Sequence, residues 1–127
     1  MRGRDIRRYG YKWAELWNIN IHNGIKGKLP RIKIEEYPAI KAHLDLYWDK
    51  ISKRTDKGDT PYNLRNCAYM EDFSKPKIVW KIIGNQMAFA YDANNYVMNN
   101  ACYIMTGDHL DYLLAVLNFP ITEVTFV

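Results

Sequence analysis

The sequence predicts an α+β fold with a mostly antiparallel sheet (a meander), one long amphipathic helix and one shorter C-terminal helix. Between Lys75 and Gly107, three short runs of β-branched and aromatic residues are separated by clusters of Gly, Asn and Asp. Such runs, joined by residues that favour tight turns, are typical of an antiparallel meander. In two other segments apolar residues recur every three or four positions, which indicates helices.

The expected strands are residues 15–22, 77–83, 87–91 and 96–105. In the first of them, Trp17, Ile19 and Ile21 alternate with polar residues, and this period of two predicts a half-buried strand. The other three form the meander, which we interpret as the platform of the domain.

The long helix is expected over residues 36–54 and the shorter one over residues 108–118. Pro38 suits the first turn of the long helix, and its charged face indicates structural scaffolding. The shorter helix is mostly apolar and should pack on the sheet, with Asp108 as its N-cap. The tail, residues 119–127, is interpreted as one more strand or an ordered end.

The composition bounds the class of protein. A chain of 127 residues suits a single domain, residues 1–127, and its abrupt basic start suggests a fragment of a larger protein. The chain has 48% apolar and 25% charged residues, a composition that excludes disordered and collagen-like chains. Cys67 and Cys102 are interpreted as buried thiols in a reducing compartment. No signal peptide or membrane-length apolar run is present, so we expect a cytoplasmic protein without a membrane partner.

The charge is concentrated near the N-terminus. Residues 1–33 hold nine Lys or Arg against two acids, a net +7, whereas residues 82–127 hold four acids and no Lys or Arg. This asymmetry favours contact of the first part with a polyanion. A solvated basic face is the alternative explanation.

Three segments carry candidate nucleic-acid contacts. Residues 2–12 hold four arginines with Gly and Tyr, and they suit either a phosphate-contacting arm or a solvated entry loop. The glycine-flanked loop after Asn23 is also basic. Residues 62–73 are rich in side chains that can hydrogen-bond a base edge, although the same side chains could serve the loop's own backbone.

No catalytic or metal-ligating constellation is found in the sequence. Dinucleotide, P-loop, His-x-x-x-His and nucleophile-elbow motifs are absent. Glu71-Asp72 followed by Lys75 and Lys77 hints at a metal-dependent nuclease, but Pro76 breaks the required strand. We therefore expect no catalytic residue, no metal and no cofactor in this chain.

Several segments in order resemble a known family: 3–9, 62–65 leading into 73–80, 89–92, 99–100 and 113–118. Together they resemble the TaqI-like C-terminal specificity domain over about residues 2–118. This is the target-recognition part of adenine-specific DNA methyltransferases, including fused type II restriction-modification enzymes.

The resemblance implies sequence-selective recognition of double-stranded DNA, in support of methylation by the catalytic methyltransferase domain of a parent enzyme, with cleavage as an additional option. S-adenosylmethionine, and Mg where the parent carries a nuclease, would belong to the parent's catalytic domains. As a hypothesis, six residues contact phosphates and three read base edges. The phosphate contacts are Arg4, Arg7, Arg8, Lys26, Lys28 and Arg31, and the base contacts are Asn63, Arg65 and Asn66. The alternative is a protein-protein interaction module that uses an aromatic-rich surface of Tyr and Trp anchors.

Overall fold

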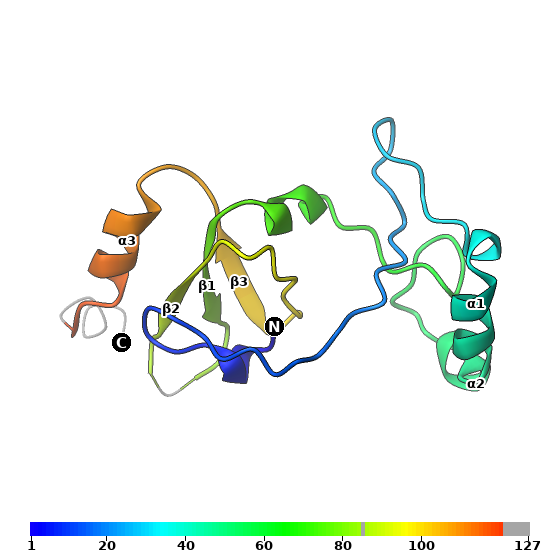
Figure 1. Cartoon of the computed structure of the whole chain (residues 1–127), viewed down its shortest axis with the longest axis horizontal. Helices are drawn as coiled ribbons and strands as arrows, with labels where there is room; N and C mark the ends of the chain where they lie inside the picture. The colour runs from blue at the N-terminus through cyan, green and yellow to red at the C-terminus, as the bar shows by residue number, and fades with distance from the viewer. Residues whose placement is uncertain (85, 121–127) are drawn as a thin grey trace. The chain divides into compact units, whose positions relative to one another are not determined.

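The computed structural model describes residues 1–84 and 86–120 and divides the chain into two compact units (Figure 1). Unit 1 is formed by Met1–Leu16 and Tyr69–Val127, and unit 2 is formed by Trp17–Ala68. The expectation of a single domain over residues 1–127 stays a prediction, because the compactness of each unit does not measure whether the two fold together. The strand or ordered end expected at the C-terminus lies mostly outside the described residues.

Unit 1 contains a three-stranded antiparallel sheet, which confirms the α+β class. The strands are β1 (Lys77–Lys81), β2 (Phe89–Asp92) and β3 (Cys102–Met105), in the order β2-β1-β3. Trp80 in the central strand lies opposite Phe89 and Tyr103, so three aromatic rings cross the sheet side by side. The predicted strands 77–83 and 87–91 correspond to β1 and β2.

The strand order corrects the predicted meander, in which β2 would be the central strand. The connection after β2 begins as a turn on Asp92, whose carboxylate accepts the backbone N–H groups of Asn94 and Tyr96 at 2.9 and 3.1 Å. Met98 is then buried against Val79, so the chain returns over one face of the sheet. It pairs with the free edge of β1, and only the end of the predicted strand 96–105 is a strand.

Both faces of the sheet are covered. On one face, helix α3 (Leu110–Leu117) packs Leu110 against Ile78 and Phe89. This confirms a short C-terminal helix that packs on the sheet, within the predicted residues 108–118. The predicted N-cap is wrong, because His109 is the N-cap and no side-chain cap is formed. On the other face, Ile6 is buried against the strands.

The N-terminal arm is built into unit 1. The backbone N–H of Tyr9 donates to the carbonyl of Phe89 at 2.7 Å, beside the edge of β2. Arg2 donates two guanidinium hydrogen bonds to the carboxylate of Asp5, at 2.8 and 3.2 Å. These bonds hold the pKa of Asp5 below its usual value. The arm is therefore anchored beside the edge of β2 by an isolated bridge and is braced by its own ion pair.

A buried ion pair joins β1 to β2, and the arm contacts it through Tyr11. The ammonium of Lys77 lies 2.6 Å from one carboxylate oxygen of Asp92, and both side chains are fully buried. The hydroxyl of Tyr11 donates to the other oxygen at 2.8 Å. Burial alone would raise the pKa of Asp92, but the hydrogen bonds from Lys77, the Asn94 backbone and Tyr11 outweigh it and hold that pKa below its usual value. Burial raises the pKa of Tyr11 to about 12.

In unit 2 the predicted long helix 36–54 is wrong in length. It is divided into α1 (Pro38–Asp45) and α2 (Trp48–Ile51). The chain tightens at the junction, where the N–H of Tyr47 donates to the carbonyl of Leu44 three residues earlier. No residue of either helix is buried, so no packed core holds one continuous helix across the junction.

The predicted strand 15–22 is also wrong, because these residues form neither a helix nor a strand. Trp17 is 87% exposed, whereas Ile21 is buried. The carbonyl of Ile21 accepts the N–H of Leu64 at 2.8 Å, and that of His22 accepts the N–H of Ile32 at 3.1 Å, but these isolated bonds do not form a ladder. The alternating pattern finds no neighbouring strand, and a strand without a hydrogen-bonded neighbour is not stable.

Candidate nucleic-acid interface

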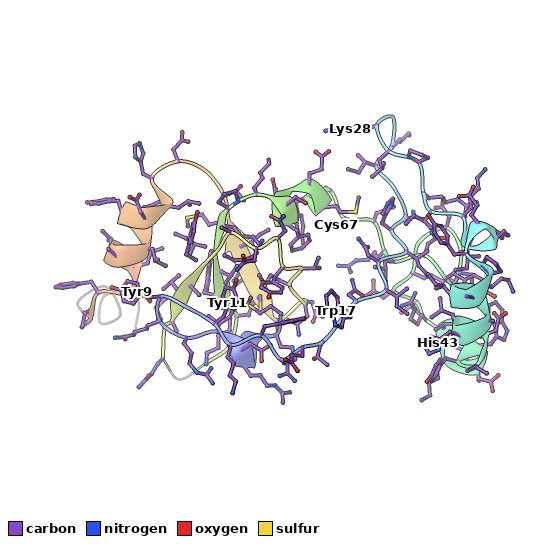
Figure 2. All side chains as sticks on the ribbon, viewed as in Figure 1. Tyr9, Tyr11, Trp17, Lys28, His43 and Cys67 are labelled. Carbon is purple, nitrogen blue, oxygen red and sulfur yellow. The ribbon has the colours of Figure 1, made fainter. Side chains whose placement is uncertain are left out.

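A basic loop, residues 23–31, projects from unit 2. It is closed at its base by a hydrogen bond of 3.1 Å from the N–H of Ile32 to the carbonyl of His22. Nearer the tip, the N–H of Ile25 donates to the carbonyl of Leu29 at 2.7 Å. Figure 2 shows Lys28 at the tip. The loop is therefore a short hairpin with Lys28 at its tip and Arg31 at its base.

Gly24 is required by the geometry of this loop. Its φ is +77°, and a Cβ at this position would lie 2.4 Å from the carbonyl oxygen of Leu29. Gly27 also has a positive φ, +75°, but a Cβ there would meet nothing within 4 Å. Substituting each glycine by alanine therefore compares the free-energy cost of the left-handed backbone alone, at Gly27, with that cost plus a steric clash, at Gly24.

We expect Gly24→Ala to destabilise the loop by about 2 to 4 kcal/mol and Gly27→Ala by about 1 kcal/mol. The left-handed backbone costs about 1 kcal/mol for either alanine, and the clash with backbone adds to it only at Gly24. Hydrogen exchange at the amides of Leu29 and Ile32 measures this opening free energy. Equal effects of the two substitutions would contradict the close packing at Gly24.

The basic loop borders an open hollow of about 870 Å³ on unit 2. Three predicted phosphate contacts and one predicted base contact line it, namely Lys26, Lys28, Arg31 and Asn66. All four side chains belong to exposed residues. The structure therefore brings together residues from two separate candidate segments of the sequence.

A hydrogen-bonded network connects the two walls of this hollow. The side chain of Asn23 accepts the backbone N–H of Asp59 at 2.9 Å. Its amide nitrogen donates to the carboxylate of Asp59 at 3.2 Å and to the side-chain oxygen of Asn66 at 2.6 Å. Asp59 also lies 3.8 Å from the guanidinium of Arg31. Sequence reasoning missed Asn23 and Asp59, because the Asn-Gly pair indicates only a turn.

Asn63, a predicted base contact, is buried in the structure. It is only 1% exposed, and both of its amide hydrogens are used within the fold. They are donated to the carbonyls of His22 and Ile32, at 3.2 and 2.9 Å, while its oxygen accepts the hydroxyl of Thr60 at 2.6 Å. Asn63 thus holds the base of the basic loop and offers no edge to a nucleotide.

The remaining predicted residues lie outside the hollow. Arg65 is exposed, with its guanidinium 3.2 Å from the carboxylate of Asp56. Arg4, Arg7 and Arg8 are exposed on the arm of unit 1. The guanidinium of Arg7 donates to the carbonyl of Arg4 at 2.6 Å, and that of Arg8 to a backbone carbonyl at 3.4 Å. These three arginines form a second basic group, held on the fixed arm.

The two units differ in charge. Unit 2 has ten Lys or Arg against six acids, a net +4, whereas unit 1 has eight of each and is neutral. The whole excess of positive charge therefore belongs to the unit that carries the hollow. A concentrated positive charge of this kind attracts polyanions.

In residues 1–84 and 86–120, no group of three or more His, Cys, Asp or Glu side chains could hold a metal ion. Over the same residues, no helix is long and apolar enough to span a membrane. Cys67 and Cys102 are free and partly buried, and burial raises the pKa of the Cys102 thiol.

The sequence of the whole chain indicates what kind of domain carries this hollow. The model of the TaqI-like C-terminal specificity domain matches residues 1–126. The chain belongs to this family. The resemblance inferred from the sequence segments is thereby confirmed, and it extends over both units of the specificity domain. No curated protein matches the chain closely enough to show a relationship.

Membership defines the general role of the chain. It is a DNA-recognition specificity domain of restriction-modification enzymes. A specificity domain selects the target and leaves the reaction to catalytic domains of its parent, so the family implies no catalytic site in this chain.

Proposed function

We propose that this chain recognises double-stranded DNA in a sequence-selective manner, as the specificity domain of an adenine-specific DNA methyltransferase or restriction-modification enzyme. The observation that carries the proposal is the hollow on unit 2, where Lys26, Lys28 and Arg31 lie beside Asn66 in a chain of a specificity-domain family. The family match favours this function and does not support the alternative of a protein-docking module.

The proposed division of roles follows the side-chain chemistry. Lys26, Lys28 and Arg31 neutralise phosphates, because exposed cations on a projecting loop can reach a DNA backbone. Arg65 and Asn66 approach base edges, since their N–H groups can donate to acceptors in the major groove. Arg4, Arg7 and Arg8 supply further phosphate contacts from unit 1. The burial of Asn63 does not support its predicted contact with a base, so we leave it out of this proposal.

The chemistry is proposed to lie in the rest of the parent enzyme. Its methyltransferase domain would bind S-adenosylmethionine, and a nuclease domain, where one is present, would bind Mg. In this proposal the specificity domain holds the target sequence while the catalytic domain acts on it. The cytoplasm is the proposed location, because cellular DNA is the substrate.

Selection from a pool of random 30-base-pair duplexes tests the proposed function. We expect enrichment of a short sequence, and we expect the binding constant for that sequence to fall steeply with salt. Six neutralised phosphates predict a slope of about −5 in a plot of log binding constant against log salt concentration. A flat salt response, or a pool that stays random after selection, would contradict the proposal.

A further inference from the structure

We propose that Asn23, which lines the hollow but is not among the predicted DNA contacts, is a positioning residue for DNA recognition. It turns the side-chain amide of Asn66 so that the amide nitrogen is left to donate to a base. The inference rests on the proposed function, because Asn66 must meet DNA for its orientation to affect sequence preference.

The orientation of the Asn23 side-chain amide follows from its contact with a backbone N–H group, which can donate a hydrogen bond but cannot accept one. The backbone N–H of Asp59 points to the side chain of Asn23 across 2.9 Å. A backbone N–H only donates, so the Asn23 atom that receives it must be the amide oxygen. The amide nitrogen of Asn23 is then the atom that faces Asn66.

The same reasoning fixes Asn66. An amide nitrogen only donates, so the Asn66 atom 2.6 Å away must be its oxygen. Within the described part of the chain, the amide nitrogen of Asn66 has no hydrogen-bond partner. Asn66 is exposed and lines the hollow, so this nitrogen is the group available to a ligand there.

The position of Asn23 is itself tightly determined. A Cβ on Gly58 would lie 2.5 Å from the side-chain oxygen of Asn23, so the chain leaves room for Asn23 only because a glycine is there. Asn23 also donates to Asp59, whose other oxygen lies 3.8 Å from Arg31. Asn23 therefore holds Asn66, a proposed base contact, and also Asp59, which lies beside the proposed phosphate contact Arg31.

An amide held in this way presents a donor to DNA. In the major groove, donors pair with the N7 atom of purines, the O6 atom of guanine and the O4 atom of thymine, whereas the N4 group of cytosine is itself a donor. A freely rotating amide would offer either end to either partner. Fixing the amide should therefore sharpen the preference at the base pair that Asn66 meets.

A double-mutant cycle on the full chain tests this inference. The probe is the 30-base-pair duplex enriched by selection, together with variants changed at one base pair at a time. We expect Asn66→Ala to lower discrimination at one base pair by about 3- to 10-fold, the effect of one hydrogen bond. Asn23→Ala should lower discrimination at the same base pair, and the double variant should lose no more than either single variant.

Two controls keep the result interpretable. Asn20→Ala removes an exposed asparagine of unit 2 that does not line the hollow, and it should leave discrimination unchanged. If Asn23→Ala fails to fold, Asn23→Asp replaces it, because a carboxylate still accepts the Asp59 N–H but can donate neither to Asn66 nor to the Asp59 carboxylate. Ala68→Asp adds the same charge to the wall of the hollow and corrects for repulsion of DNA.

The outcomes separate this inference from the proposed function. Loss of discrimination in Asn66→Ala but not in Asn23→Ala or its aspartate substitute would overturn the positioning role alone. An equal loss of affinity for every duplex in Asn23→Ala would also overturn it, since that result indicates a merely structural residue. A wild-type chain that binds no duplex selectively overturns the proposed function and this inference together.

Discussion

Replacing Lys26, Lys28 and Arg31 by alanine is expected to weaken duplex binding about 100-fold at 150 mM salt. Each cation that neutralises a phosphate releases condensed counterions, so three lost contacts should also make the salt dependence shallower by about 2.7 in slope. All three residues are exposed and line one hollow, and none of them is buried in the core. Fluorescence anisotropy of a labelled duplex at several salt concentrations measures both quantities.

The matched control removes three other cations from the same unit. Lys50, Lys53 and Lys57 are exposed, belong to unit 2 and do not line the hollow. Their replacement by alanine changes the net charge by the same amount, so it tests whether charge alone is responsible. We expect this control to change the slope of the salt dependence much less than the replacement of Lys26, Lys28 and Arg31 does. Equal losses would show that DNA binding depends on the net charge of unit 2 and not on the hollow.

The parts of the fold that could be predicted are those fixed by local pattern. In β1 and β2 the β-branched and aromatic residues match strands with buried side chains, and the apolar spacing of α3 matches a helix packed on a sheet. The strand order could not be predicted in this way. It depends on the turn at Asp92 and on the burial of Met98, which together carry the chain to the far edge of β1.

The two wrong elements share a physical cause. Periodicity predicts which face of an element would be buried, but it does not show that a partner exists to bury it. Leu46, at the junction of α1 and α2, is 79% exposed, and Trp17 in the expected strand is 87% exposed. Without packing, the predicted continuous helix and the predicted strand lose the interactions that would stabilise them.

Charge and residue type were sufficient to select some residues of the candidate site from the sequence. Lys26, Lys28, Arg31 and Asn66 were selected from the sequence, and they line the same hollow. Burial of Asn63 was not predictable, because it depends on the carbonyls of the residues that flank the basic loop. The role inferred for Asn23 needs a network that joins segments 36 and 43 residues apart, which no local pattern encodes.

Lys77→Met is expected to destabilise unit 1 by about 3 to 5 kcal/mol, because it leaves the buried Asp92 carboxylate without its ion-pair partner. The pair is 2.6 Å long and fully buried, so water cannot replace the lost ammonium in the packed fold. Hydrogen exchange at the amides of β1 and β2 measures this loss. Lys75→Met provides the control, because Lys75 pairs with Asp72 at 2.8 Å on the surface and should contribute at most about 1 kcal/mol.

Lys77→Met is also expected to affect the arm that carries three of the proposed phosphate contacts. Asp92 accepts the hydroxyl of Tyr11 as well as the ammonium of Lys77, and Tyr11 lies on the arm that carries Arg4, Arg7 and Arg8. An unpaired carboxylate is expected to loosen that arm, so exchange at the Tyr9 amide should rise together with exchange in β1. If Lys77→Met cost no more than Lys75→Met, the buried pair would not be what fixes the arm, and contacts such as the packing of Ile6 and the bond from Tyr9 to Phe89 would have to hold the arginines.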